Sequence, residues 1–146
     1  MSDSYYKKDV EDFFFEKPLQ LNLFLAVEKM IDSIGPVTIE VSKSQISFGT
    51  KTKFAWVWLP PIWSNNRPEN CIVLTFGAEK QIEDQQIVEV VEPYPGRFTH
   101  HIIVETESDL TNEVYHWLCE SYDFSQKRGK KQNQTTNSKE NQTSTS

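Results

Sequence analysis

The first regular pattern along the chain is helical. Between Leu19 and Ile34, apolar residues recur every three or four positions, and polar residues fill most of the positions between them. This spacing predicts an amphipathic helix that ends at Gly35 and Pro36, two residues that stop helices. The apolar stripe of this helix consists of Leu23, Phe24, Val27, Met30, Ile31 and Ile34.

After Pro36 the period of the pattern changes to two residues. In "VTIEV", Val37, Ile39 and Val41 share one face, and polar residues share the other. Further short apolar runs predict more strands at residues 46–48, 54–59 and 71–76, a short edge strand at 87–92, and a last strand at 98–105. A long loop around Trp63 separates the third strand from the fourth. The short connections elsewhere favour antiparallel pairing.

The segment "SDLTNEVYHWLCESYDF" returns to helical spacing, and Ser108 or Asp109 can cap the helix that it predicts. The apolar stripe of this closing helix is Leu110, Val114, Trp117, Leu118 and Tyr122. The element order predicts an α+β fold. We expect a two-layer sandwich, in which an antiparallel sheet of about five or six strands is flanked by an N-terminal and a C-terminal helix.

The chain divides into three parts by composition. Residues 1–17 are expected to form an arm, irregular or a short helix, that lays one of Phe13, Phe14 and Phe15 on the body. Residues 18–125 form the single α+β domain. Residues 126–146 contain no aliphatic or aromatic side chain, so they cannot bury enough surface to offset the entropy of ordering. This segment is predicted to be a disordered polar tail.

Charge and cysteine usage narrow the class of protein. Ten basic and twenty acidic residues lie in positions 1–126, a net charge of −10 against −6 for the whole chain. An acidic body repels phosphate backbones, so nucleic acid is not an expected partner except through the tail segment "KRGKK". No apolar run is long enough to span a membrane, and the charged N-terminus lacks a signal-peptide pattern. A cytoplasmic location is expected, with Cys71 and Cys119 as free, reduced thiols.

The sequence contains few groups that could carry chemistry. His100 and His101 are adjacent in a strand, so they point to opposite faces and cannot both join one site without a bulge. The third histidine, His116, lies in the closing helix, and no CxxC, HExxH, GxSxG, GxGxxG or GxxxxGK motif is present. The sequence therefore predicts no metal site and no cofactor.

The strand "FAWVWL" carries large side chains on both faces. Phe54, Trp56 and Trp58 alternate with Ala55, Val57 and Leu59, so helices on one face leave bulky apolar groups on the other. Such a face needs a covering segment or a ligand. Either the N-terminal arm covers it, or Trp56 and Trp58 line a pocket for a small anionic or planar ligand. The pocket would take its positive charge from Lys43 or Arg97 and a polar contact from His100 or His101.

The segments "VTIEVSKSQISF", "FAWVW", "YPGRFTHHIIVE" and "LTNEVYHWLCESY" resemble a family of small bacterial domains of unknown function. Some members of that family carry the label of predicted transport proteins. The resemblance runs from Val10 to Tyr122 and is most specific at the Ser42–Ser44 turn and at residues 97–101. The family pattern implies the same candidates, Lys43, Arg97, His100 and His101, and a fold similar to that of frataxin-like iron chaperones.

Three functions are compatible with these features. The first is a non-enzymatic module that binds a small molecule or a protein on the aromatic sheet face, with Lys43, Trp56, Trp58, Arg97, His100 and His101 as ligand-binding residues. The second is an enzyme that uses His100 or His101 as a proton-transfer group. The third is a module in which this face binds a second copy of the chain.

Overall fold

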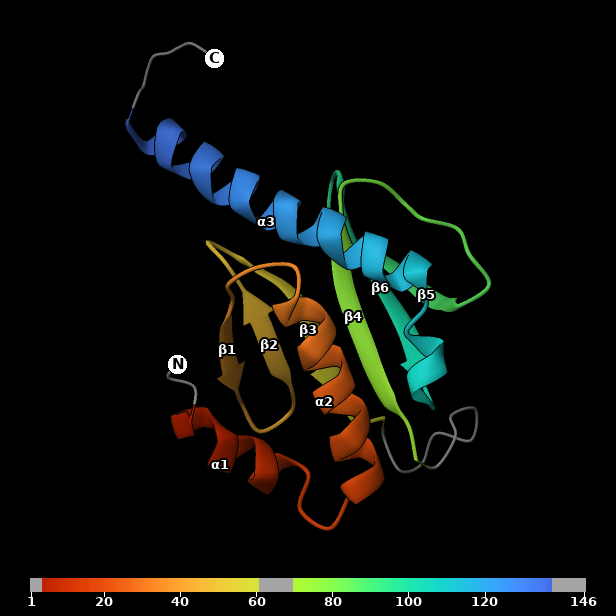
Figure 1. The fold of residues 1–146 in the computed structure, drawn as a ribbon. Coiled ribbons are helices and arrows are strands. Elements are labelled where there is room, and N and C mark those ends of the chain that lie inside the picture. Colours follow the sequence, from red (N-terminus) through yellow and green to blue (C-terminus); the bar gives the residue numbers. More distant parts are fainter. Residues whose placement is uncertain (1–3, 61–69, 138–146) are drawn as a thin grey trace.

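The computed structural model describes the backbone of residues 4–60 and 70–137 and the side chains of residues 7–60 and 70–127. Figure 1 shows the elements in chain order. The helices are α1 (Ser4–Phe13), α2 (Pro18–Asp32) and α3 (Asn112–Asn137), and a short 3-10 turn, η1 (Glu107–Asp109), precedes α3. The strands are β1 (Thr38–Val41), β2 (Ile46–Gly49), β3 (Lys53–Trp58), β4 (Ile72–Ala78), β5 (Ile87–Tyr94) and β6 (Arg97–Val104). The predicted loop around Trp63 and the end of the predicted tail lie outside the described residues.

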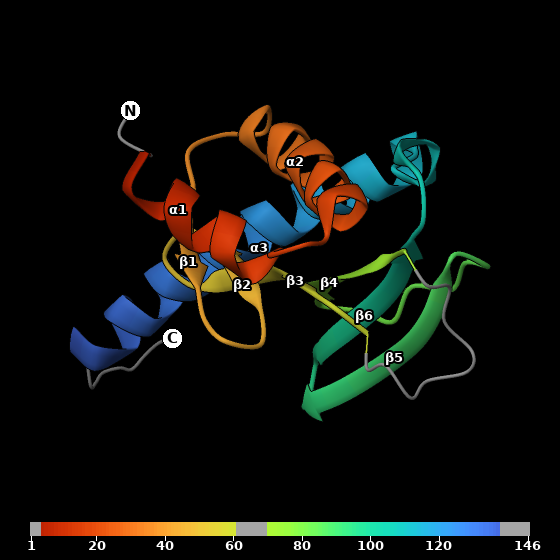
Figure 2. The ribbon, with the colours of Figure 1, turned by 90° about the horizontal axis from the view of Figure 1, so that it is seen from below.

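The six strands form one antiparallel sheet in the order β1-β2-β3-β4-β6-β5. Figure 2 shows α1, α2 and α3 on the same side of this sheet. The predicted α+β architecture is therefore confirmed, and so is the edge position of the strand that begins at Ile87. We call the sheet face turned away from the three helices the distal face.

Helix α2 forms where the sequence predicts it and buries the predicted stripe. Pro18 begins the helix, where a missing backbone N–H does no harm, and Leu23, Phe24, Val27 and Ile31 are buried. The ring of Phe24 stacks on Phe48 of β2 at a centroid distance of 5.9 Å, which joins the helix layer to the sheet.

The predicted N-terminal arm is a helix that packs on the helix layer. Val10 and Phe14 are buried in the core, and the Phe14 ring lies 5.6 Å from Phe24 of α2. Phe15 is 68% exposed. Helix α1 contacts β1 at one edge of the sheet. Phe14 therefore contributes to the core on the helix side of the sheet and not to the distal face.

Helix α3 begins later than predicted. Its cap is Thr111, whose Oγ1 accepts a hydrogen bond from the Val114 backbone N–H at 3.2 Å. Asp109 instead accepts hydrogen bonds from the backbone N–H groups of Glu105 and Thr106, which closes the turn before the helix. The predicted caps, Ser108 and Asp109, are thus wrong. The apolar stripe predicted for this helix is buried in whole or in part: Val114, Trp117, Leu118 and Tyr122 lie in α3, and Leu110 lies just before it.

Helix α3 also runs past Phe124 to Asn137. Residues 126–137 contain no aliphatic or aromatic residue. The disorder of the tail stays a prediction.

Strand β3 contains one more residue than its partner β2 at their shared end. Phe48 pairs with Ala55, but the next residue, Gly49, pairs with Lys53, so Phe54 has no counterpart in β2. This register shift is a β-bulge, which changes the direction of the side chains beside it.

Because of the bulge, Phe54 packs on the helix side. Its ring meets Tyr122 of α3 edge-on at 5.6 Å and is 2% exposed. The prediction that Phe54 shares a face with Trp56 and Trp58 is therefore wrong.

The turn between β2 and β3 is joined to α3 by polar contacts. The hydroxyls of Thr50 and Ser125 are 2.5 Å apart, and Thr52 Oγ1 donates to the Ser125 carbonyl at 3.2 Å. These contacts hold the start of β3 at a defined position along the helix.

Candidate functional site

A row of side chains crosses the distal face of the sheet. Trp56 of β3 pairs with Thr75 of β4, Thr75 pairs with His101 of β6, and His101 pairs with Glu89 of β5. Directly paired residues of neighbouring strands point to the same side of a sheet. Trp58 stands on this face as well, two positions after Trp56. The alternation of residues along β3, β4 and β6 therefore brings together side chains that are up to 45 positions apart in the sequence.

Thr75 connects Trp58 to His101 by hydrogen bonds. The indole N–H of Trp58 donates to Thr75 Oγ1 at 2.8 Å, and Oγ1 lies 2.8 Å from Nδ1 of His101. The Trp58 and His101 rings also meet edge-on, with centroids 5.8 Å apart. Residues of β3 and β6 thus meet above β4, which explains why Thr75 is only 4% exposed on a face without helices.

These residues line a groove of about 540 Å³, which we call the tryptophan groove. Its lining comes from four strands, β3 to β6, and from the connection between β1 and β2. It consists of Gln45, Trp56, Trp58, Thr75, Pro93, Tyr94, Arg97, Thr99 and His101. Both tryptophans are half-buried, so part of each indole faces the groove. Among the described lining residues Arg97 alone carries a full charge, and none is a carboxylate. The described lining thus contains one cationic side chain, on a body that is acidic overall.

His100 lies on the opposite side of the sheet. It is completely buried and stacks on Phe76 at 5.0 Å, and Phe76 stacks in turn on Trp117 of α3 at 5.6 Å. Its Nε2 accepts a hydrogen bond from the Ile82 backbone N–H at 3.0 Å. Burial lowers the pKa of His100 below 6.5, the value of an ordinary histidine. The two histidines have separate places: His100 belongs to the core, and His101 belongs to the groove.

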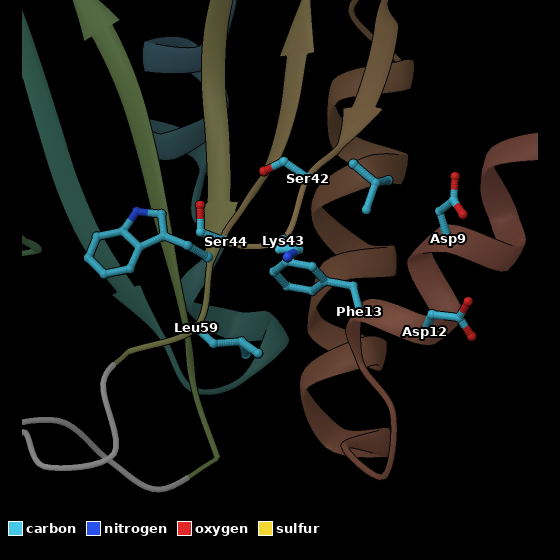
Figure 3. Close-up of a pocket in the computed structure, with 9 residues that line it drawn as sticks. Asp9, Asp12, Phe13, Ser42, Lys43, Ser44 and Leu59 are labelled. Atoms are coloured by element: carbon cyan, nitrogen blue, oxygen red, sulfur yellow. The ribbon is translucent and has the colours of Figure 1, made fainter.

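Lys43 lies in a second depression, which we call the Lys43 hollow. It occupies the turn between β1 and β2, and Phe13, Asp9 and Asp12 of the N-terminal segment line the same hollow (Figure 3). This hollow measures about 1070 Å³, and Trp58 lines both the hollow and the tryptophan groove. The structure therefore does not bring Lys43 to Arg97, and the predicted pair of cationic residues is divided between two depressions.

Sequence reasoning missed Thr75, Tyr94 and Thr99. Thr75 looked like one residue of a buried strand, although it is the single hydroxyl side chain in "CIVLTF", and that feature could have marked it. Tyr94 pairs with Arg97 across the β5–β6 turn, which places its 62% exposed ring at the rim of the groove.

The described residues contain no group of three His, Cys, Asp or Glu side chains arranged to hold a metal ion. Cys71 and Cys119 form no disulfide, as predicted, and Cys71 is buried. No helix among the described residues is long and apolar enough to cross a membrane.

A family model for a domain of unknown function, DUF5655, matches residues 10–125. The chain belongs to this family. The match covers the whole sheet and the part of α3 that packs on it, close to the extent of the predicted resemblance. Comparison with curated proteins and with solved structures finds no match. The comparisons thus confirm a family of unknown function, and they support neither a transport label nor a frataxin-like fold.

Proposed function

We propose that this DUF5655 protein is a non-enzymatic binding module, and that its ligand is a small planar molecule bound in the tryptophan groove. The observation that carries the proposal is the convergence of Trp56, Trp58, Arg97 and His101 on one groove of the distal face. Each was a candidate on sequence grounds, and they come from two different strands.

The size and chemistry of the groove support this function. Its volume of about 540 Å³ falls within the range of about 300–1,000 Å³ that is typical of small-molecule pockets. Two indoles and the ring of Tyr94 offer flat apolar surface, and a few polar groups stand among them. Such a mixture binds a planar ligand by stacking and orients it by hydrogen bonds.

The second candidate function is an enzyme with His101 as a proton-transfer group. General bases of this type are commonly oriented by a carboxylate that stabilises the imidazolium formed during the reaction. Here the hydroxyl of Thr75 orients the ring. A neutral hydroxyl at Nδ1 gives an imidazolium less stabilisation than a carboxylate at that nitrogen would, and for this reason we rank proton transfer second.

Binding of naphthalene derivatives tests the proposal. We would measure the thermal stability of the protein with 2-naphthoate, 2-naphthamide and 2-naphthylmethylammonium, which share one planar ring system. At a concentration one hundred times Kd, a ligand of the folded state stabilises it by about 2.7 kcal/mol. We expect stabilisation by at least one of the three, and we expect Trp56→Ala to abolish it.

Phe15→Ala is the matched control, because Phe15 is an exposed aromatic residue in the turn after α1, outside the groove. It should leave the stabilisation unchanged. If none of the three compounds stabilises the protein, or if Trp56→Ala responds like the parent chain, the groove is not the binding site that we propose. Light scattering separates the third possibility, because a dimer that buries the distal face would lose its second copy in Trp56→Ala.

A further inference from the structure

Residues 79–86 cross over β6, and we call this segment the strap. Both β4 and β5 pair antiparallel with β6, so β4 and β5 run parallel, and the connection between them must pass over the strand that separates them. Figure 1 shows the strap as the green loop between β4 and β5. It passes on the helix side, where Gln86 donates to the Asp109 carbonyl at 2.8 Å and accepts from the Thr111 hydroxyl at 3.1 Å.

One side chain of β6 holds the middle of the strap. Nε2 of His100 accepts the Ile82 backbone N–H at 3.0 Å, and His100 itself is completely buried. Among the described residues, no other hydrogen bond joins residues 79–83 to another element. The Ile82 side chain packs against the core, whereas residues 79–81 and 83–85 are exposed. The middle of the strap is therefore held by one hydrogen bond and one apolar side chain.

This hydrogen bond requires a neutral imidazole. Nε2 can accept only when it carries no proton, so the ring proton of His100 is on Nδ1. Nδ1 has no hydrogen-bond partner of good geometry within the described part of the chain. A second proton would go to Nε2, where it would face the N–H of Ile82, and two donors cannot form a hydrogen bond. Protonation of His100 therefore breaks the link between the strap and β6.

We propose that the strap is an acid-sensitive segment, which is released from β6 below about pH 6.5 while the sheet stays folded. The inference is independent of the proposed function, because the tryptophan groove lies on the other face of the sheet. Release would uncover His100 and the ring of Phe76, which stacks on it at 5.0 Å. An apolar surface would then appear on the helix side.

The groups around His100 leave burial as the main influence on its charge. From β4 and α3 its neighbours are the uncharged ring of Phe76 and, behind it, that of Trp117. Burial lowers the pKa of His100, the Phe76 backbone raises it by less, and His101, on the opposite face, lowers it further. The ionisable side chains of the strap, of β5 and of the first turns of α3 are exposed: Glu79, Lys80, Glu83, Asp84, Glu89, Glu92, Glu113, His116 and Glu120.

The population of the released state follows from linkage between protonation and opening. The imidazole has the ordinary pKa of 6.5 when it is exposed and a lower pKa when the strap covers it. Below pH 6.5 the released state therefore binds more protons, and its population rises by up to about tenfold per pH unit. Between pH 7.5 and pH 5.5 the rise amounts to as much as about tenfold. Aspartates and glutamates, with pKa values of about 4, stay ionised over this range.

Hydrogen exchange measured by NMR tests the release, because the Ile82 amide is the donor that it would free. The protection factor of this amide, corrected for intrinsic exchange, should fall by about five- to tenfold between pH 7.5 and pH 5.5. Its exchange should depend little on urea, as in a local opening, whereas the Leu74 amide of β4 should exchange by global unfolding and respond strongly. An unchanged protection factor, or equal urea dependence of the two amides, would overturn the proposal.

His100→Gln separates the release of the strap from other effects of acid. The amide oxygen of glutamine can accept the Ile82 N–H and does not titrate, so Ile82 should keep its protection at pH 5.5 in this variant. His116→Gln, at an exposed position of α3, is the matched control and should lose protection as the parent chain does. If Ile82 loses protection equally in the parent and in His100→Gln, His100 does not control the strap.

The parent chain supplies a further test that needs no variant. Nitrogen-15 NMR of the histidine side chains at pH 8 should show the ring proton of His100 on Nδ1, since Nε2 accepts from Ile82. A ring proton on Nε2 at this pH would mean that the Ile82 N–H has a different acceptor, and acid release through His100 would be refuted.

Discussion

Acidification below pH 6.5 should destabilise this protein, because His100 must stay neutral in the folded state. The imidazole is completely buried, and its Nε2 accepts the Ile82 backbone N–H at 3.0 Å. A proton on Nε2 would replace this hydrogen bond with two donors that face each other. It would also place a charge beside the ring of Phe76, without solvent around it. In the unfolded chain the same imidazole is free to take up a proton.

The size of the effect follows from linkage between protonation and folding. Burial lowers the pKa of His100 in the folded protein, whereas the unfolded chain has the ordinary value of 6.5. Above pH 6.5 the His100 imidazole is mostly neutral in both the folded and the unfolded chain, so its protonation costs no stability. Below it the unfolded state binds more protons, so the free energy of unfolding falls by up to about 1.4 kcal/mol per pH unit. At pH 5 the loss amounts to as much as about 2 kcal/mol.

Urea unfolding at pH 7.5, 6.5, 5.5 and 5.0 measures this loss. His100→Gln is the informative variant, because its amide oxygen can take the place of Nε2 as an acceptor without titrating. The parent should lose stability over this range, and the variant should lose less, by up to about 2 kcal/mol at pH 5. His116→Gln, at an exposed position of α3, should behave like the parent. Parallel curves for the parent and His100→Gln would refute the argument.

Three further predictions concern the fold. Thr111→Ala should cost about 1 kcal/mol of unfolding free energy because it removes the α3 cap, and Thr111→Ser should restore most of it; equal stability of all three chains would show that the cap contributes nothing. Phe54→Ala should cost about 3–5 kcal/mol, clearly more than Trp56→Ala, since the bulge puts Phe54 in the core; the reverse order in urea unfolding would contradict the bulge. Gly35→Ala should cost about 1–3 kcal/mol of unfolding free energy, because the new Cβ would stand 2.5 Å from the Tyr122 hydroxyl oxygen. The cost should be smaller in a Tyr122→Phe background, and an unchanged cost there would exclude this clash as the cause.

The elements of this fold could be predicted from the sequence because periodicity is strong where one face is buried. The helical spacing of Leu23 and Val27 marked α2, and the alternation at Val37 and Ile39 marked β1. The cap of α3 was misplaced because several Ser, Thr and Asp residues precede it. Local sequence does not decide which of them adopts the capping conformation.

The candidate site was less predictable, since it depends on which face each strand turns to the helices. The sequence required His100 and His101 to point to opposite sides but could not say which of them would be buried. Lys43 looked like a partner of Arg97 because both stand beside strands that flank the tryptophans. Only the structure shows that Lys43 and Arg97 line different depressions, although Gln45 of the same β1–β2 turn lines the groove with Arg97. Thr75 is part of the candidate site because it contacts Trp58 of β3 and His101 of β6, and the pattern of residues along β4 carries no information about these contacts.

The contact between the β2–β3 turn and α3 has a consequence for how the chain tolerates insertions and deletions. Both sides of β3 carry apolar side chains, so a slip by one residue would bring indoles against the helices and small aliphatic groups outward. Hydrophobicity alone would penalise that slipped pairing only weakly. The threonines that join the turn to Ser125, and the bulge at Phe54, are what distinguish the two pairings. Deletion of a single residue between Thr50 and Phe54 should therefore exchange the side chains that β3 turns to the helices with those on the distal face. The groove would then lose both indoles, although the composition of the strand would hardly change.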